Sequence, residues 1–362
     1  MTSPAHKKRL DYVDGLRGLA AMLVVVAHWL EHSVKNDLFA VAPADQSPYL
    51  LLSFYLGRIG VVAFFCISGF VVPFSFRTET GVRGFVISRF FRLYPAYWLS
   101  LAAALLVYPL IGSAVTAPQA LANVTMIQTV LRQPDVIGVY WTLFVEIIFY
   151  ATCTLLFVSH RLHRPGTQLA MVIVFLMVGL AGALFRYTHP ASGLAIGLPT
   201  YLAAMHFGTI ARLRFLEGAP ISARRFAAIA AGLMALVFAI NTLGYVASDD
   251  KGATWLASSL AYAIGLSAFL LCIRFHLFGG AVLAYLGAIS FAVYLFHPLV
   301  IRTICPPLAS VVSLPALVPV SLLLVFVTVS IVAAIVYRLV EQPAVALGRR
   351  LIKGRALQRA IA

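Results

Sequence analysis

The chain has 362 residues, of which 62% are hydrophobic and only 11% are charged, and its mean hydropathy is +0.95. Ordinary soluble domains carry about 25% charged residues, so this composition excludes a soluble enzyme, a disordered chain and a basic nucleic-acid-binding protein. It predicts an all-α polytopic membrane protein. In such a chain the net charge of +15 reports first on orientation, because cytoplasmic loops carry an excess of lysine and arginine.

Ten apolar stretches are long enough to cross a membrane as helices, which takes about 17–25 residues. With the first residue in the cytoplasm, most lysines and arginines fall in cytoplasmic segments, and removing or adding one helix would destroy this asymmetry. The sequence therefore predicts about ten spanning helices with cytoplasmic N- and C-termini. They are expected at residues 15–33, 51–75, 93–113, 139–158, 169–186, 193–211, 225–246, 254–273, 279–301 and 316–338.

The predicted organisation is a single membrane domain, residues 1–345, followed by a short basic cytoplasmic tail, 346–362. We expect it in the inner membrane of a bacterium. The first apolar stretch follows the basic residues Lys7, Lys8 and Arg9 and has no small-residue cleavage site, so it is interpreted as a helix and not as a signal peptide. The four cysteines form no CxxC pattern, and neither a disulfide framework nor a cysteine metal site is predicted.

The first helix carries ionisable residues that are candidates for function, because a charge inside the hydrocarbon costs about 2.5–3.5 kcal/mol on insertion scales. At about 100° per residue Asp14, Arg17 and His28 share one face, and His28 lies about 16 Å deeper than Arg17. His28 is the main catalytic candidate and Asp14 a second one. The alternative for His28 is a hydrogen bond that only packs it between helices.

Glu146 is the one carboxylate well inside an apolar stretch, at an expected depth of about 10 Å below the outer surface. His28 reaches a similar depth on a helix that runs the opposite way, so the two side chains are expected to meet. Arg58 lies about as deep, and an ion pair with Glu146 would allow both charges in the membrane. Glu146 is a catalytic candidate and Arg58 a substrate-binding candidate, although a purely structural pair would explain both.

Arg89 and Arg92 lie in the expected cytoplasmic loop before the third span. The positive-inside rule alone would explain arginines there. Their spacing, however, puts both on one side of a helical turn, where guanidinium groups can bind phosphates bidentately. Together with Arg17 at the cytoplasmic edge, they are the candidate phosphate-binding residues.

Three further motifs predict local features of the structure. Tyr294 and His297 lie one turn apart and are predicted to line an outer cavity, with an interfacial aromatic belt as the alternative. The Ser68-Gly69 pair interrupts a bulky helix and predicts a point of close packing. Residues 28–32 fit the H-x-x-E-H zinc pattern, but the pattern is short and no distant carboxylate ligand is apparent. We therefore predict no metal.

Taken together, these segments resemble the acyltransferase-3 family of integral membrane acyltransferases over about residues 10–345. Each motif is weak alone, but their order on a ten-helix chain is specific. In chain order they are Asp14-Gly15-Leu16-Arg17 followed by ten residues and His28, Phe64-Phe65 with Ser68-Gly69-Phe70, Arg89-x-x-Arg92, Trp141-Thr142-Leu143 with Glu146, and Tyr294 with His297-Pro298.

The resemblance implies transfer of an acyl group, commonly acetyl, from cytoplasmic acyl-CoA to a hydroxyl of a carbohydrate or another hydroxylated acceptor, often on the far side of the membrane. It implies that His28 is the central catalytic residue and that Arg17, Arg89 and Arg92 are functional. We expect the CoA phosphates near these arginines and the thioester at His28, which acts either as general base or as transient acyl carrier. Trp141, beside the Glu146 motif, joins the substrate-binding candidates.

A different class of protein would also suit these residues. A proton-coupled secondary transporter uses intramembrane histidine, glutamate and arginine side chains within a bundle of about ten helices. The cytoplasmic arginine pair aligned with an intramembrane histidine favours the enzyme, because a transporter has no particular need for it. The expected partners are the lipid bilayer, acyl-CoA and the acceptor, with no nucleic acid.

Overall fold

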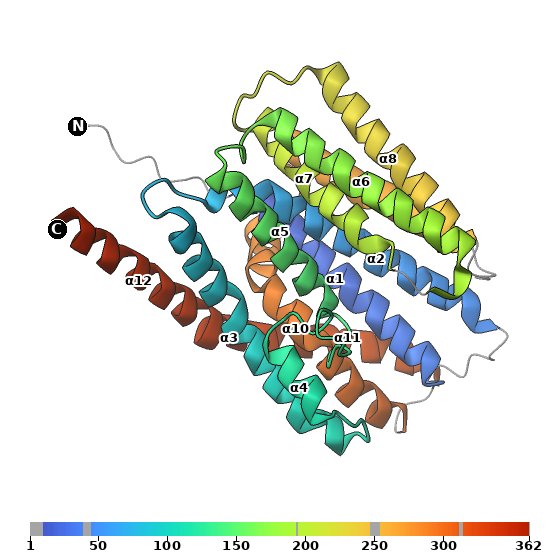
Figure 1. The fold of residues 1–362 in the computed structure, drawn as a ribbon. Coiled ribbons are helices and arrows are strands. Elements are labelled where there is room, and N and C mark those ends of the chain that lie inside the picture. The colour runs from blue at the N-terminus through green and yellow to red at the C-terminus, as the bar shows by residue number, and fades with distance from the viewer. Residues whose placement is uncertain (1–9, 39–44, 193–194, 247–253, 311–313, 362) are drawn as a thin grey trace.

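The computed structural model describes residues 10–38, 45–192, 195–246, 254–310 and 314–361, and within these residues it contains helices and no strands (Figure 1). Lys7, Lys8 and Arg9 of the predicted cytoplasmic flank lie outside the described residues. The helices are α1 (Asp11–Lys35), α2 (Gln46–Val71), η2 (Val72–Ser75), α3 (Gly81–Leu110), α4 (Ala117–Val124), α5 (Trp141–Val158), α6 (Pro165–Thr188), η3 (Pro190–Ser192), α7 (Gly197–Phe215), α8 (Ala223–Val246), α9 (Thr254–Phe275), α10 (Ala281–Ala309), α11 (Leu314–Val336), η4 (Tyr337–Glu341) and α12 (Gln342–Ile361).

The prediction of an all-α polytopic membrane protein is confirmed. In the described part of the chain, nine helices are long and apolar enough to cross a membrane, with α11 and α12 counted as one continuous run. The ten predicted spans correspond in order to α1, α2, α3 and α5 to α11. Only α7 falls outside the nine. Every residue from Thr200 to Ala211 is buried, so α7 faces other helices instead of lipid and needs less apolar surface.

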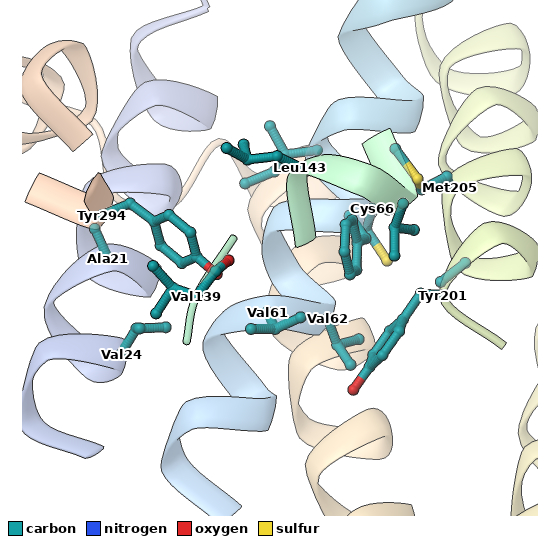
Figure 2. Close-up of a cluster of buried hydrophobic side chains, with 14 of the residues drawn as sticks. Ala21, Val24, Val61, Val62, Cys66, Val139, Leu143, Tyr201, Met205 and Tyr294 are labelled. Atoms are coloured by element: carbon teal, nitrogen blue, oxygen red, sulfur yellow. The ribbon is translucent and has the colours of Figure 1, made fainter. Parts of the chain in front are cut away.

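The centre of the bundle is built around α2. Helix α1 packs on α10 and α2, while α2 also packs on α7 and α9. Side chains of α1, α2, α5, α7 and α10 form the buried core there, with Val24, Val62 and Tyr201 among them (Figure 2). Helices α6 and α8 lie outside α7, and α11 lies against α10. The helices that carry the candidate site residues are therefore held from several sides.

The predicted close-packing point at Ser68-Gly69 is confirmed. A Cβ atom at Gly69 would overlap the carbonyl oxygen of Met205 on α7, and one at Gly208 would overlap the carbonyl oxygen of Cys66 on α2. The hydroxyl of Thr209 donates a hydrogen bond to the Gly69 carbonyl at 2.9 Å. The two backbones thus touch where α2 and α7 cross.

Replacing Gly69 by alanine is expected to lower the thermal unfolding midpoint of the detergent-purified protein, because overpacking of this kind costs about 1–3 kcal/mol. Gly232 on α8 is the matched control, since no atom lies within 4 Å of a Cβ built there. Gly232→Ala should leave the midpoint unchanged or raise it slightly, because alanine favours helix over glycine by about 1 kcal/mol. Equal midpoints for wild type and Gly69→Ala would contradict the close contact.

Helix α3 begins well before the predicted span, and the arginines expected in the preceding loop lie within it. It starts at Gly81 and includes Arg83, Arg89 and Arg92. The residues between Gly84 and Pro95 contain no glycine or proline that would break a helix. The prediction of a loop was wrong because the arginines were taken to mark the start of the membrane span. Charged residues can end the apolar part of a helix without ending the helix itself.

The segment before α5 folds into the bundle. Ile137 and Tyr140 are fully buried, although they precede the helix. The side-chain amide of Asn123 at the end of α4 donates to the Pro134 carbonyl at 2.9 Å and fixes this segment. As a consequence α5 begins deep within the protein and not at its surface.

The predicted basic tail continues the last spanning helix. A π-helical turn, η4, joins α11 to α12, and α12 packs along α3. The side chain of Phe91 lies 2.9 Å from where a Cβ at Gly348 would be. In Figure 1 α12 extends toward the end of the bundle where α1 begins. That end is the one predicted to face the cytoplasm.

Candidate active site

Five sequence-predicted site residues line one cavity of about 400 Å³, here called the deep cavity. It lies between α1, α2, α3, α5, α10 and α12. The predicted residues in its wall are Arg17, Arg89, Arg92, Glu146 and Tyr294. Arg349, Tyr150, Ser68, Ser88 and Ser290 add further polar groups, and Phe64, Phe65, Phe291 and several aliphatic side chains complete the wall.

A second hollow of about 770 Å³, the entrance cavity, adjoins the deep cavity at the end of the bundle where α1 begins. The two share Arg17, Val71, Ser88 and Arg349 as lining residues. Asp14 lines the entrance cavity and forms a salt bridge of 2.9 Å with Arg17. The predicted common face of α1 therefore brings Arg17 to the junction of the two cavities.

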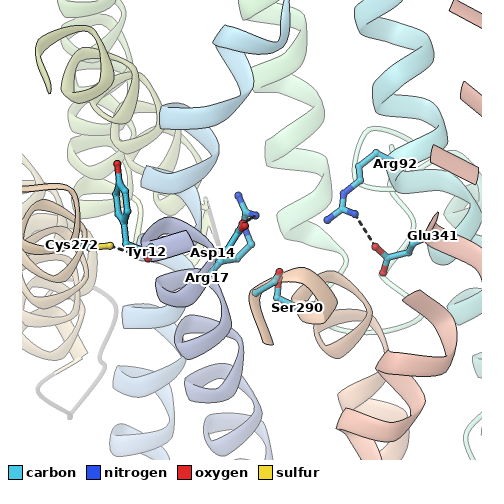
Figure 3. Close-up of polar contacts among 8 residues, drawn as sticks. Tyr12, Asp14, Arg17, Arg92, Cys272, Ser290 and Glu341 are labelled. Carbon is cyan, nitrogen blue, oxygen red and sulfur yellow. Dashed lines mark hydrogen bonds and ion pairs between the residues drawn. The ribbon is translucent and has the colours of Figure 1, made fainter. Parts of the chain in front are cut away.

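Arg92 forms a salt bridge that sequence reasoning did not find. Its Nη1 lies 2.9 Å from a carboxylate oxygen of Glu341, and only 1% of the Glu341 side chain is exposed. Figure 3 shows this pair on α3 and η4, with Arg17 and Asp14 drawn on α1. One donor of Arg92 is thus committed to Glu341, while the residue still lines the deep cavity.

Arg89 and Glu146 line the same cavity. The Arg89 guanidinium lies 5.6 Å from the ring centroid of Phe85 and 5.7 Å from that of Tyr150. Its Nε is buried and has no hydrogen-bond partner among the described residues. The Tyr150 hydroxyl donates to the Glu146 carboxylate at 2.5 Å. Arg89 thus keeps one N–H group unpaired among the described residues, and the Glu146 carboxylate in the same cavity is anchored by Tyr150.

Tyr294 closes the end of the deep cavity that lies away from the entrance cavity. Its hydroxyl shares a hydrogen bond of 2.8 Å with the hydroxyl of Thr142 and donates to the Val139 carbonyl at 3.1 Å. On the other side its ring lies 5.9 Å from the ring of His297, centroid to centroid. One aromatic side chain therefore separates the cavity from the histidine.

His28 and His297 form a hydrogen-bonded pair that joins α1 to α10. The Nδ1 atoms lie 2.9 Å from the Val24 carbonyl for His28 and 3.1 Å from the Val293 carbonyl for His297. Because a carbonyl only accepts hydrogen bonds, Nδ1 carries the proton in each ring. His297 Nε2, with its lone pair, lies 3.2 Å from His28 Nδ1. The neutral His28 ring then keeps its basic lone pair on Nε2, and the residue is half-buried.

Two expected contacts of Glu146 were wrong. The ring of Trp141, at the start of α5, lies 6.4 Å from the ring of Phe65, well inside α2. Glu146 follows Trp141 by five residues on α5, so at 1.5 Å per residue it lies about 7 Å from the level of these two rings, toward the entrance end of the bundle. Arg58 precedes Phe65 by seven residues on α2 and therefore lies about 10 Å from the same level, toward the opposite end. The inward fold of the chain before α5 displaces Glu146 from the levels of Arg58 and His28.

Arg58 is held by neutral partners. Its guanidinium donates to the Tyr245 hydroxyl at 3.2 Å and to the Ser258 hydroxyl, and it stacks 4.2 Å from the centroid of Phe54. Trp141 packs in an aromatic cluster with Phe65 and Tyr201. Neither Arg58 nor Trp141 lines the deep or the entrance cavity, so their assignment to the acceptor stays a prediction.

The side chains of the H-x-x-E-H pattern have separate partners. Glu31 forms a salt bridge of 2.5 Å with Lys35, and His32 Nδ1 lies 3.2 Å from the side-chain amide of Asn36. In the part of the chain that the structure describes, no three histidine, cysteine, aspartate or glutamate side chains are grouped as a metal site would need.

Three residues of the site were not singled out from the sequence. Arg349 was counted only as part of the basic tail, although the helical spacing of Arg349 and Lys353 was a usable signal. Glu341 is an acid at the end of an apolar run and therefore called for a cationic partner. Tyr150 lies one turn after Glu146, where helical neighbours meet.

Comparison with known proteins agrees with this arrangement. Residues 10–338 match the acyltransferase-3 family, which is described as an acyltransferase domain. The chain belongs to the acyltransferase-3 family. The resemblance predicted from its motifs is therefore confirmed. The acyltransferase MdmB of Streptomyces mycarofaciens is 28% identical over 158 residues, which are 41% of this chain and 39% of that protein. No solved structure is significantly similar to the chain.

In this acyltransferase-3 member, the arginine and histidine of the first motif have different surroundings. Arg17 lies at the junction of two cavities with other cations around it. His28 lies beyond Tyr294 with a second histidine on its Nδ1. A cationic end and a histidine with a free ring nitrogen are thus separated along one helix.

Proposed function

We propose that the protein is a membrane O-acyltransferase that moves an acyl group from cytoplasmic acyl-CoA to a hydroxyl of a carbohydrate or another hydroxylated acceptor. The proposed acyl group is acetyl. One observation carries the proposal. The deep cavity runs from the cationic side chains Arg17, Arg89 and Arg92 to Tyr294, whose ring lies against the histidine pair. Family membership supports acyl transfer as the reaction class.

The separation of Arg17 and His28 along α1 suits an acyl-CoA donor. The rise from Arg17 to His28 on α1 is about 16 Å, comparable to the extended pantetheine arm. Aromatic and aliphatic side chains along the deep cavity suit the uncharged arm, and the arginines suit anionic and carbonyl oxygens. The donor would therefore enter at the end of the bundle predicted to be cytoplasmic.

His28 acts as the general base in this proposal. Its Nε2 takes the proton of the acceptor hydroxyl while the hydroxyl oxygen attacks the thioester carbonyl. The carbon–sulfur bond then breaks, the ester remains on the acceptor, and the CoA thiolate regains the proton from His28. Tyr294 must release Thr142 before the thioester reaches this nitrogen, because the tyrosine closes the inner end of the cavity.

The acceptor approaches from the end of the bundle opposite the entrance, where Arg58 and Trp141 are proposed to contact it. The protein is placed in the inner membrane with the start of α1 in the cytoplasm. Glu146 and Asp14 are proposed to orient polar groups or handle protons during transfer.

The purified protein in proteoliposomes, supplied with acetyl-CoA labelled in the acetyl group and a panel of saccharides and other hydroxylated acceptors, tests this function. We expect release of free thiol that depends on the acceptor, together with label in an ester. A proton-coupled transporter would instead take up solute along an imposed pH gradient. Uptake of that kind, with no CoA binding and no thiol release, would overturn the proposal.

A further inference from the structure

The entrance cavity contains more cations than its carboxylates can neutralise. Its basic lining residues come from α1, the η2–α3 connection, α7 and α12, and its lining carboxylate among the described residues is Asp14. The basic residues are Arg17, Arg77, Arg212, Arg349 and Lys353. Five cations from four parts of the chain thus converge on one hollow.

Two of these cations are already paired. Arg17 forms its 2.9 Å salt bridge with Asp14, and Arg212 forms one of 2.9 Å with Glu217. For Arg77, Arg349 and Lys353, no carboxylate within the described ranges lies at salt-bridge distance. These three side chains are exposed at the rim of the cavity, so they are available to an anion.

The positive-inside rule does not account for this convergence. That rule places cations on one side of the membrane but does not direct them toward one another. Arg349 and Lys353 are four residues apart on α12, and like charges at that spacing destabilise a helix by about 0.2–0.5 kcal/mol. Both line the entrance cavity, whereas Arg350 lines neither cavity. An anion in the entrance would offset the repulsion.

We propose that the entrance cavity binds the phosphate groups of the CoA donor, with Arg77, Arg349 and Lys353 as phosphate ligands and α12 as part of the donor site. This inference rests on the proposed function and places the phosphates farther out than Arg89 and Arg92. Arg92 is committed to Glu341, and Arg89 lies beside Tyr150. Arg349 lines both cavities and marks where the nucleotide ends and the arm begins.

The chemistry of CoA matches the two cavities in order. CoA carries three phosphate groups on its nucleotide end and an uncharged pantetheine arm. Guanidinium groups bind phosphate oxygens through paired charge-assisted hydrogen bonds, and lysine binds them as a point charge. The more cationic cavity, which is the larger in volume, takes the nucleotide, and the smaller, partly aromatic one takes the arm.

Steady-state kinetics of the full-length protein in proteoliposomes test the site. The double variant Arg349→Gln/Lys353→Gln and the single variant Arg77→Gln are compared with Arg350→Gln, an exposed neighbour that lines neither cavity. For acetyl-CoA we expect KM to rise at least about tenfold in the double variant, because charged hydrogen bonds are lost, with kcat within about twofold. Arg350→Gln should match wild type.

Truncated donors give the decisive comparison. Acetyl-pantetheine has no phosphate, so the variants and wild type should use it with the same KM. Equal increases in KM for acetyl-CoA and acetyl-pantetheine would overturn the proposal, and so would an unchanged KM for acetyl-CoA. A KM increase seen in anionic lipid but absent in neutral lipid would also overturn it, in favour of contact between α12 and lipid head groups.

Direct binding keeps this test separate from the proposed function. Adenosine 3′,5′-bisphosphate, the nucleotide part of CoA without the thioester arm, should bind wild type and the Arg350→Gln variant, and bind the double variant at least about tenfold more weakly. Failure of wild type to transfer acyl groups would count against the enzyme proposal alone. Equal nucleotide affinity in wild type and the double variant would count against the phosphate site.

Discussion

Replacing His28 by alanine is expected to lower the rate of acyl transfer by about 10²–10⁴-fold, the usual contribution of a positioned general base. The reason is that Nε2 of His28 is the basic nitrogen that the hydrogen bonds of the pair leave free. The measurement is turnover of labelled acetyl-CoA at matched amounts of protein in proteoliposomes. The thermal unfolding midpoint shows whether the variant is folded.

His32→Ala is the matched control, because His32 lies one turn further along α1 and hydrogen-bonds to Asn36. It should retain transfer, which would also end the zinc-site interpretation of this motif. His297→Gln tests the positioning role of the partner ring. We expect it to shift the pH profile of kcat, which a purely structural side chain would leave in place. Wild-type turnover by His28→Ala would remove His28 from the mechanism.

The choice between general base and transient acyl carrier has a separate readout. If His28 carries the acyl group, wild type incubated with labelled acetyl-CoA and no acceptor should become labelled, and His28→Ala should not. If His28 is the base, as proposed here, no label stays on the protein. Mass spectrometry of the peptide that contains His28 measures this directly.

Replacing Arg92 by glutamine is expected to destabilise the protein by about 3–5 kcal/mol, because it leaves the Glu341 carboxylate buried without its ion-pair partner. The double variant Arg92→Gln/Glu341→Gln should recover most of this loss, since it removes both charges together. Thermal unfolding in detergent measures the effect. An unchanged midpoint in Arg92→Gln would mean that the pair contributes no stability.

The same variants report on donor binding. If Arg92 is also a phosphate ligand, the double variant will regain stability but keep a raised KM for acetyl-CoA. If the phosphates bind at the entrance cavity, as inferred above, the double variant will keep a KM close to that of wild type. Arg89→Gln is the matched comparison, because Arg89 lines the deep cavity and forms no salt bridge with the described carboxylates.

The spans were predictable from the sequence because hydropathy reports exposure to lipid. Helix α7 shows the limit of that signal, since its residues from Thr200 to Ala211 are enclosed by protein and carry polar groups that lipid would exclude. The Ser68-Gly69 contact was also predictable, because two small residues in a bulky helix leave room for a backbone. Both the spans and this contact could be predicted because the residues that determine them lie within one helix.

The pairings within the site were not predictable, because they depend on depth and on distant segments. Glu146 was expected near Arg58 on the assumption that α5 starts at the surface. The inward fold of the segment before it, held by Asn123, breaks that assumption. Arg92 and Glu341 are 249 residues apart, and no spacing in the sequence joins them. The common face of Arg17 and His28, in contrast, was predictable, because it depends only on spacing within one helix.

Sidedness of the donor tests the central claim most directly. Proteoliposomes are sorted by the accessibility of a C-terminal tag, and labelled acetyl-CoA is supplied only on the side of the tag or only on the opposite side. We predict His28-dependent transfer to the hydroxylated acceptor only when the donor is on the side of the tag, where the entrance cavity opens. Transfer from the opposite side, or label transfer that is equal in wild type and His28→Ala, would contradict the account.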